Sequence, residues 1–489
     1  MKAAAIQAPH ETCLNSSSMG KNVKSVTTAL KREVGLVSSV SLLVGTMVGS
    51  GIFMTPEWVL YYTGSPGASL VIWAACGVLS MLSALCYIEL GSVIKESGGE
   101  YIYLLKIFGP LPAFLHFYTN EILVRPSSSA AVALSFAKYV VAPFYPGCVP
   151  PQVVVKFLAA ACIIVVLFIN CFSVRLATST QTFFTAAKVL ALVVILTGGT
   201  VILLQGQTRN LQNAFHGTAA GFGPVGLAFY QALWAYGGWS NLNSVIEEVK
   251  RPEVNLPRAV LISVPLVTFL YVMVNVSYFA AMTSSELLTS GAVAVTWGNK
   301  ILGTWMWLMP VAVAMSTFGT INGSFFCTSR VCYVAAREGH LPKILSMVHV
   351  QCLTPSPSLI FKALLSLCII VPGNFVKIVN YCSFTTWLSY GMIFSGLVYL
   401  RIKEPHLPRS YKVPLAVPVI ILVVSAYLIL APIIDSPEIE YLYAVLFILS
   451  GIIIYVPLIH FKLHPEFLSK ITLYLQLLLQ VVPATKNID

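Results

Sequence analysis

The stretch GTMVGSGIF, residues 45–53, places three glycines inside an apolar run long enough to cross a membrane. Gly costs an α-helix about 1 kcal/mol relative to Ala, and a helix in lipid must satisfy its backbone polar groups internally. One interpretation is a packing face, because Gly45 and Gly49 form a GxxxG pair that lets helices approach closely. The other is an interrupted helix at Gly49, Ser50 and Gly51, whose unwound backbone must then line a cavity.

The composition indicates a polytopic membrane protein. Of the 489 residues, 57% are hydrophobic and 10% are charged, whereas a soluble domain carries about 25% charged residues. A spanning helix needs about 20 apolar residues, and open strands cannot face lipid. We therefore predict an all-α membrane protein with twelve transmembrane helices, over residues 36–62, 68–90, 110–140, 152–172, 183–204, 223–246, 258–281, 301–330, 357–372, 377–400, 414–434 and 441–461.

The net charge of +11 would permit a nucleic-acid partner, but its distribution favours a membrane protein. Basic residues gather on one side of the predicted spans, which is the positive-inside pattern and puts both termini in the cytoplasm. We expect a cytoplasmic tail over 1–33, a transporter domain over 34–461 and a cytoplasmic tail over 462–489 with a short amphipathic helix. The basic residues on the cytoplasmic side include Lys21, Lys24, Lys31, Arg32, Lys250, Arg251, Arg258, Arg401, Lys403, Arg409 and Lys412.

The sixth predicted span holds a second interruption. Gly237 and Gly238 adjoin each other within FYQALWAYGGWSNLNSVIEEV, residues 229–249. The first and sixth spans are five helices apart, which is the arrangement of transporters built as inverted repeats with the substrate between two broken helices. We therefore predict a 5+5 inverted repeat, two further C-terminal helices, and a substrate site near residues 47–51 and 234–240.

The eleven cysteines do not predict a disulfide framework, because most lie in predicted spans or face the cytosol. Cys148, in FYPGCVPPQ, is the one cysteine in a predicted outside loop. A leftover outside cysteine indicates either an intermolecular bond or a free thiol.

Several longer stretches resemble the light subunits of heteromeric amino acid transporters, in the amino acid–polyamine–organocation superfamily. They are VGTMVGSGIFMTPEWVL, ALCYIELGSVIKESGGEYIYL, WAYGGWSNLNSVIEEVKRPEVNLPRAV and REGHLPKILSM, and the resemblance covers residues 33–484. GCVPPQVVVK is most similar to the b(0,+)-type subunit that pairs with rBAT, and the aromatic-preferring and L-type subunits are close alternatives. The resemblance implies a LeuT-like transporter of the plasma membrane. It also implies a disulfide from Cys148 to a single-pass glycoprotein heavy chain of the rBAT type or the 4F2-antigen type.

The resemblance assigns roles to the two interruptions. The substrate carboxylate would meet backbone N–H groups of the first, and the substrate ammonium would meet backbone carbonyls of both. Trp234 would cover the substrate as a lid, although a packing aromatic is the alternative. The implied residues are Gly49, Ser50 and Gly51 for the carboxylate, Met47, Trp234 and Gly237 for the ammonium, and Val48, Ser240 and Thr386 for the rest of the site.

Gly237 bears on the substrate. The dibasic-transporting relatives carry an acid there, and no other acid lies in the interruption, so a cationic side chain would stay unpaired in a dry pocket. Thr385 and Thr386 add room, and the Arg of anionic-substrate relatives on that span is missing. We expect neutral L-amino acids with large or aromatic side chains as substrates. The alternative is a broad b(0,+)-type exchanger that also carries cystine or cationic amino acids.

Two basic residues interrupt apolar spans. Arg125 has Glu121 one turn earlier as a candidate partner, although an intramembrane charge is by default a functional hypothesis. Lys188 has snorkelling toward the interface as its simplest interpretation. In sodium-independent relatives a Lys on the fifth span occupies the place of sodium. The resemblance therefore implies that Lys188 bridges the first span to Ser316 and Thr317.

Other classes of protein fit the sequence less well. An intramembrane enzyme would need clustered His, Asp or Cys at one depth, and the eight His are scattered. We expect no cofactor, no metal and no nucleic-acid partner. A channel or receptor on the same fold is the remaining alternative.

Overall fold

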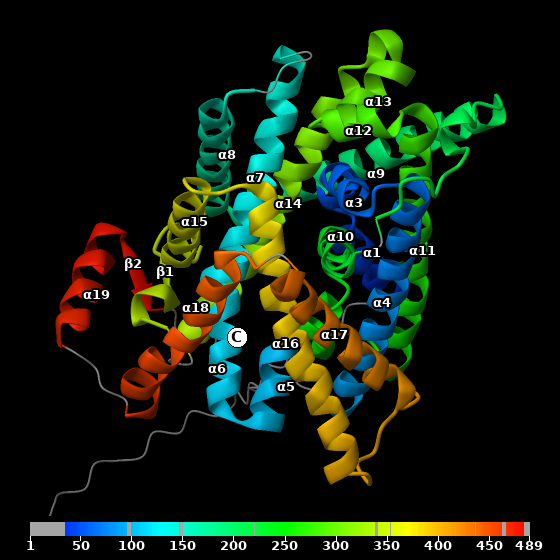
Figure 1. The fold of residues 1–489 in the computed structure, drawn as a ribbon. Helices are drawn as coiled ribbons and strands as arrows, with labels where there is room; N and C mark the ends of the chain where they lie inside the picture. Colours follow the sequence, from blue (N-terminus) through cyan, green and yellow to red (C-terminus); the bar gives the residue numbers. More distant parts are fainter. Residues whose placement is uncertain are drawn as a thin grey trace, which may run out of the picture. The chain divides into compact units, whose positions relative to one another are not determined.

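The computed structural model describes residues 35–483 apart from 95–98, 146–147, 149, 220, 338–340, 353, 436 and 462–465. The described residues belong to one unit, and the predicted tail over 1–33 lies outside them. The α-helices (Figure 1) are α1 Leu36–Met47, α2 Gly51–Met54, α3 Pro56–Thr63, α4 Pro66–Val93, α5 Gly99–Phe108, α6 Pro110–Thr119, α7 Arg125–Val141, α8 Gln152–Phe172, α9 Val174–Leu204, α10 Phe222–Ala235, α11 Pro252–Ala281, α12 Ser284–Thr289, α13 Val293–Ile301, α14 Leu308–Arg337, α15 Ser356–Ile370, α16 Phe375–Lys403, α17 Ala416–Asp435, α18 Ile439–Tyr455 and α19 Glu466–Leu478.

Shorter elements connect these helices. Two are π-helical turns, η1 Asn120–Val124 and η7 Val456–His460. The others are the 3-10 turns η2 Ala142–Phe144, η3 Arg209–Leu211, η4 Asn241–Glu248, η5 Gly303–Trp305 and η6 Lys343–Ser346, and the strands β1 Met347–His349 and β2 Val481–Pro483.

The all-α membrane architecture is confirmed. Among the described residues, seven segments are long and apolar enough to cross a membrane. The predicted spans over 110–140, 223–246 and 377–400 are also helical, as α6–η1–α7, α10 with η4, and α16. The number of crossings and the inverted repeat stay predictions. The seven segments are Leu36–Met54, Pro66–Val93, Gln152–Phe172, Ala186–Leu204, Pro252–Ala281, Gly303–Tyr333 and Ala416–Asp435, and two shorter apolar helices are Ser356–Ile370 and Ile439–Tyr455.

Some helix boundaries differ from the sequence-based expectation. The first span is divided, because α2 ends at Met54 and α3 begins at Pro56, where a proline suits the first helical position. Helix α9 begins at Val174, well before the expected residue 183, because the Ser173 hydroxyl caps it by accepting from the Leu176 N–H. Helix α14 begins after the expected residue 301 because residues 303–305 form a 3-10 turn.

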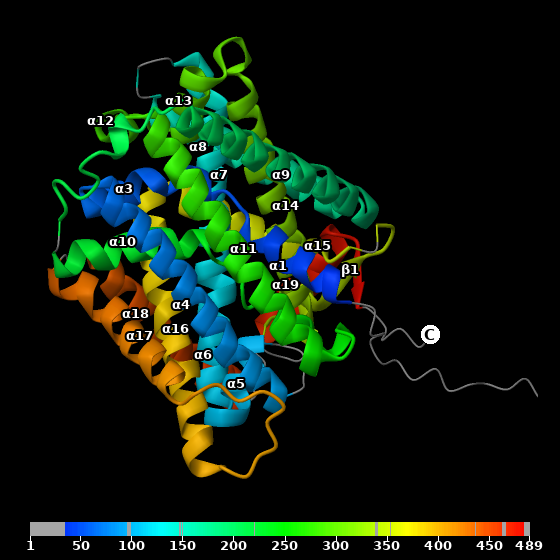
Figure 2. The same cartoon turned by 90° about the vertical axis from the view of Figure 1, so that its right-hand side faces the viewer.

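The helices around the two interruptions pack closely. Helix α11 contacts both α1 and α4, and α14 contacts α7 and α9 (Figure 2). At the centre, Trp73 of α4 and Tyr271 of α11 are fully buried with ring centroids 5.7 Å apart, and the Tyr236 ring lies 5.0 Å from Tyr271. Aromatic pairs of this kind contribute about 0.5–1.5 kcal/mol beyond area burial. The aromatic core therefore fixes the end of α10 against α4 and α11.

A buried carboxylate fixes the far end of α4. Glu89 has no exposed surface. It accepts from Arg401 Nε at 2.8 Å and from the Val413 N–H at 2.9 Å, and Arg409 Nε lies 3.5 Å away. A buried charge is tolerated only when it is paired and hydrogen-bonded, so this network holds α4, α16 and the loop before α17 together.

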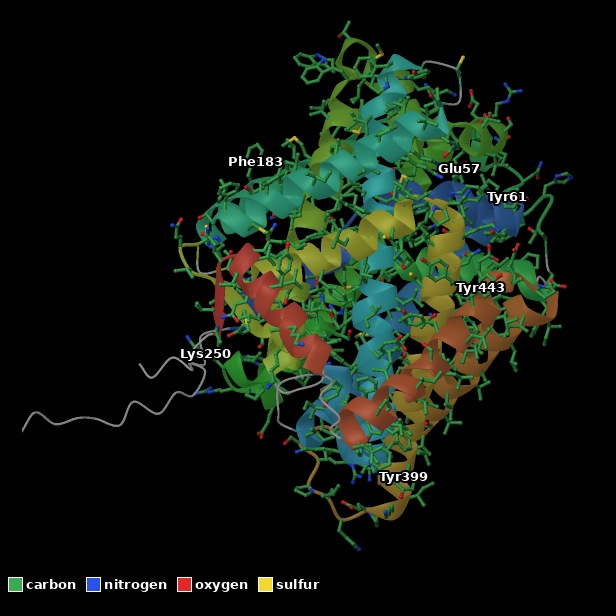
Figure 3. All side chains as sticks on the ribbon, turned by 90° about the vertical axis from the view of Figure 1, so that its left-hand side faces the viewer. Glu57, Tyr61, Phe183, Lys250, Tyr399 and Tyr443 are labelled. Carbon is green, nitrogen blue, oxygen red and sulfur yellow. The ribbon has the colours of Figure 1, made fainter. Side chains whose placement is uncertain are left out.

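The carboxy-terminal segment folds back on the helices. Strand β2 pairs antiparallel with β1, and Val348 lies opposite Val482. Helix α19 precedes it, in the region where the sequence predicts an amphipathic helix. Figure 3 shows that the protein surface carries apolar and aromatic side chains, among them the exposed Phe183 of α9 and Tyr443 of α18. Such a surface suits hydrocarbon rather than water.

Candidate functional site

The first interruption lies at the glycines that predict it, but it begins at Val48, one residue before the expected Gly49. Helix α1 ends at Met47, Val48 adopts an extended conformation (φ −72°, ψ 95°), and α2 begins at Gly51. The N–H groups of Gly49, Ser50 and Gly51 donate to no backbone carbonyl in the described part of the chain. These three groups stand at the start of a half-helix, where the partial positive charge favours an anion.

The glycine that the packing requires is Gly51. A Cβ atom at Gly51 would lie 2.5 Å from Ala235 Cα, at the end of α10. A Cβ at Gly45 would meet nothing within 4 Å, and one at Gly49 would make ordinary contact with Thr320 at 3.8 Å. Among the described residues, Gly45 and Gly49 therefore make no close helix contact of the GxxxG kind. The close approach joins the two interruptions to each other.

The second interruption follows α10. Residues 236–240 form a turn between α10 and the 3-10 turn η4. Gly238 has φ +113°, a conformation that L side chains rarely adopt, and Thr46 Oγ1 lies 3.4 Å from its carbonyl oxygen. Gly237 is exposed. The backbone of the second interruption thus borders the end of α1.

Tyr271 of α11 joins both interruptions through one hydroxyl group. Its Oη lies 2.7 Å from the Met47 carbonyl oxygen and 3.1 Å from the Ala235 carbonyl oxygen. These carbonyls end α1 and α10, so each lacks a partner within its helix. No sequence pattern indicates this role for Tyr271, because its partners lie 224 and 36 residues away in the chain.

The side chains that the sequence predicts around the substrate differ from one another in burial and in their contacts. Trp234 is half-buried, and its ring makes an edge contact with Phe375, with centroids 5.5 Å apart. Thr386 is half-buried on α16, and within the described structure no hydrogen bond joins it to either interruption. Thr385 is buried and donates to Tyr381 within its own helix, so it adds no free polar group.

The structure brings an acid beside the second interruption that the sequence did not indicate. Ser240 Oγ lies 3.5 Å from Glu100 Oε1, which also accepts from the Tyr87 hydroxyl at 3.3 Å. The other carboxylate oxygen lies 3.3 Å from His116 Nε2. Glu100 is far from Ser240 in the chain, so spacing could not reveal it. The carboxylate is already engaged by three side chains.

Lys188 contacts the first interruption. It is buried, and its Nζ donates to the Val48 carbonyl at 3.4 Å and to Thr320 Oγ1 at 3.3 Å. Thr320 lies one turn beyond the expected partners on α14. Ser316 Oγ is buried without a hydrogen-bond partner in the described structure, and Thr317 donates to carbonyls of its own helix. The bridge from the first span to α14 is present, with Thr320 in place of Ser316 and Thr317.

The other intramembrane cations have local partners. Arg125 Nε lies 2.7 Å from Glu121 Oε1, which confirms the predicted pair. Glu121 lies in the π-helical turn η1, and such turns are frequent at functional sites. Lys362 donates to Ser324 Oγ at 2.9 Å and to Thr328. Neither cation is placed at the interruptions.

Cys148 lies between η2 and α8, and its side chain is exposed with a free thiol.

Among the described residues no group of His, Cys, Asp or Glu has the arrangement of a metal site. The site is therefore made of backbone groups at two helix ends, a lysine bridge and a tyrosine bridge. This arrangement can hold both ends of a zwitterion.

Comparison with known proteins identifies the family of this chain. The amino acid permease family matches residues 34–458, and the chain belongs to that family. It is an amino acid transporter, not an enzyme, and its identification among the light subunits of heteromeric amino acid transporters is confirmed. The b(0,+)-type amino acid transporter 1 of Mus musculus is 50% identical over 463 residues, which cover 94% of this chain and 95% of that protein. The Homo sapiens protein of the same name is 49% identical over 463 residues, with the same shares covered. The large neutral amino acids transporter small subunit 2 of Homo sapiens is 45% identical over 412 residues, which cover 84% of this chain and 77% of that protein.

Proposed function

We propose that this chain is a sodium-independent exchanger of large neutral L-amino acids, aromatic ones included, across the plasma membrane. The zwitterion would bind between the two interruptions, with its carboxylate on the N–H groups of Gly49, Ser50 and Gly51. The observation that carries this proposal is that these donors have no backbone acceptor in the described structure. They also begin a half-helix, whose dipole favours an anion.

The substrate ammonium would meet carbonyl oxygens. A carbonyl oxygen has two lone pairs, so the Met47 carbonyl retains one after accepting from Tyr271. Likewise the Trp234 carbonyl accepts from the Gly237 N–H at 3.2 Å and retains a second acceptor position. The carboxylate and the ammonium of the zwitterion then each face an opposite partial charge. This binding does not depend on the side chain of the substrate.

The side-chain specificity would depend on Gly237. This residue carries no charge, and a Cβ placed on it would meet only the Trp234 carbonyl, at 3.2 Å. A neutral side chain therefore enters without leaving an ion unpaired. Glu100 lies beside the neighbouring Ser240 but is engaged by His116 and Tyr87.

A broad b(0,+)-type exchanger that also carries cystine or cationic amino acids is a second candidate. Two observations favour it: the 50% identity to a b(0,+)-type transporter and the presence of the Glu100 carboxylate near the second interruption. In that case a cationic side chain would compete with His116 for the carboxylate.

Uptake of a labelled amino acid panel distinguishes the two candidates. The chain should carry leucine and aromatic amino acids far better than arginine. Gly237→Asp should raise arginine uptake, and Gly237→Asn, of nearly equal size and no charge, should not. Strong arginine uptake by the unmodified chain would favour the b(0,+)-type candidate. Efflux that rises when an amino acid is added on the opposite side would support a carrier, because a channel shows no such stimulation.

We further propose that a single-pass glycoprotein heavy chain, of the rBAT type or the 4F2-antigen type, is bound through Cys148. The exposure of the Cys148 side chain supports this proposal. We also propose that both termini are cytoplasmic, because the basic residues follow the positive-inside pattern.

A further inference from the structure

A hollow of about 480 Å³ lies between helices α4, α10 and α17, away from the two interruptions. This volume falls within the range of about 300–1,000 Å³ that is typical of sites for small molecules. The three helices contact one another (Figure 2). The side chains that line the hollow include Val78 and Leu79 of α4, Phe229 of α10, and Val424, Tyr427 and Leu428 of α17.

The lining offers hydrocarbon and aromatic surface. Its one polar side-chain group is the Tyr427 hydroxyl, and this group donates to the Phe222 carbonyl at 2.9 Å. A water molecule needs two to four polar partners, and apolar cavities stay dry and take up apolar molecules. The hollow therefore does not suit an amino acid or water.

Hydrogen bonds beside the hollow keep the three helices in place. The Tyr230 hydroxyl donates to the Leu428 carbonyl at 2.5 Å, which joins α10 to α17. The Tyr236 hydroxyl donates to the Trp73 carbonyl at 3.0 Å, which joins the end of α10 to α4. These bonds hold α10 against α17 and α4 beside the hollow.

The hollow faces the lipid side of two predicted spans. Its lining residues lie near the middle of Pro66–Val93 and of Ala416–Asp435, both long and apolar enough to cross a membrane. Val78 is 58% exposed at the hollow, and its neighbours Val71 and Val423 are also exposed. At this depth the surrounding solvent is hydrocarbon.

We propose that this hollow is a binding site for an acyl chain of a membrane phospholipid. An acyl chain reaches the middle of the bilayer while its head group stays at the interface, so it needs no polar partner in the hollow. A sterol is the alternative occupant, and its labelling is an outcome of the test below. A bound chain would support α10, the half-helix that ends at the second interruption.

Photolabelling in proteoliposomes tests the proposal with the heavy-chain complex. A phospholipid with a photoreactive group near the end of its acyl chain should label α4 and α17 beside the hollow. Ala75 also lines the hollow, so Ala75→Phe and, independently on α17, Val424→Phe should fill it and reduce that labelling several-fold. Val71→Phe and Val423→Phe place the same ring on exposed neighbouring positions and should leave the labelling unchanged.

A photoreactive sterol provides the second arm of the test. Labelling of the hollow by the sterol alone would overturn the proposal, and so would phospholipid labelling that Ala75→Phe and Val424→Phe leave unchanged. Equal labelling of every exposed helix face would also overturn it, because that pattern indicates unspecific contact with the bilayer. Surface delivery and heavy-chain pairing of each variant show whether it has folded.

Discussion

The Tyr271 hydroxyl lies 2.7 Å from the carbonyl oxygen of Met47, the last residue of α1. The same oxygen lies 3.1 Å from the carbonyl of Ala235, the last residue of α10. One hydroxyl proton is thus shared between two helix ends that are distant in the chain. The relative position of the two interruptions depends on this contact.

Replacing Tyr271 by Phe should impair transport more than it impairs stability. An interhelical hydrogen bond in a membrane protein contributes about 0.6 kcal/mol on average, so the variant should fold, with a slightly lower melting temperature. Turnover should fall about ten-fold, the equivalent of about 1.4 kcal/mol in barrier height, because both helix ends lose their common donor. Uptake by purified complexes in proteoliposomes, with the melting temperature measured in parallel, gives both quantities.

Tyr278→Phe is the matched control for Tyr271→Phe. Tyr278 is also a fully buried tyrosine of α11, and its hydroxyl has no hydrogen-bond partner in the described structure. Its removal should leave turnover near that of the unmodified protein. Equal turnover of the two variants would contradict a coupling role for the Tyr271 hydroxyl.

Gly51→Ala should reduce transport, whereas Gly45→Ala should not. The new methyl group at residue 51 would lie 2.5 Å from Ala235 Cα, so the backbone must move. Overpacking of this kind costs about 1–3 kcal/mol. At residue 45 no described residue lies within 4 Å of the added methyl group, and Ala is the better helix former by about 1 kcal/mol. Uptake and melting temperature of the two variants check the prediction, and a greater loss for Gly45→Ala would contradict it.

Local sequence patterns predicted the interruptions but not their surroundings. Adjacent glycines within an apolar run indicate unwinding because of their weak helix propensity, and both breaks lie at the expected residues within about one position. Tyr271, Thr320 and Glu100 approach the breaks from other helices. A single sequence carries no signal for such contacts, because they depend on how the helices pack.

Charge patterns predicted the contact within one helix but not the contact between helices, because only the latter depends on how the helices pack. Arg125 and Glu121 are four residues apart on one helix face, and that spacing predicted their pair correctly. Lys188 was expected to reach Ser316 and Thr317, yet Thr320 is its partner on α14. The rotation of α14 about its axis decides which residue faces Lys188, and it is set by packing against α7 and α9.

Cys148→Ser should abolish a disulfide-linked complex with the heavy chain. The Cys148 thiol is exposed, in a segment predicted to face the outside, where disulfides persist. On non-reducing gels the larger band should disappear completely in this variant. Cys368→Ser removes another exposed cysteine and should leave the band intact. Persistence of the band in Cys148→Ser would exclude this cysteine as the attachment point.

Lys188 should make transport independent of sodium. Its ammonium lies 3.4 Å from the Val48 carbonyl and 3.3 Å from Thr320 Oγ1. We propose that it takes the place, between the first interruption and α14, that sodium occupies in sodium-coupled relatives. Uptake should be equal in sodium and in choline medium. A steep dependence on sodium in proteoliposomes would exclude this role.

Lys188→Ala should slow turnover more than it weakens substrate binding, because the ammonium contacts the helix break and α14. Thr320→Val removes only one of its two acceptors and should have a smaller effect in the same direction. Lys156→Ala serves as the control, since this lysine of α8 donates to the Val371 carbonyl at 2.6 Å and touches neither interruption. Turnover and substrate affinity, measured separately in the three variants, decide the assignment. A change in affinity with unchanged turnover for Lys188→Ala would instead place its ammonium in the substrate site.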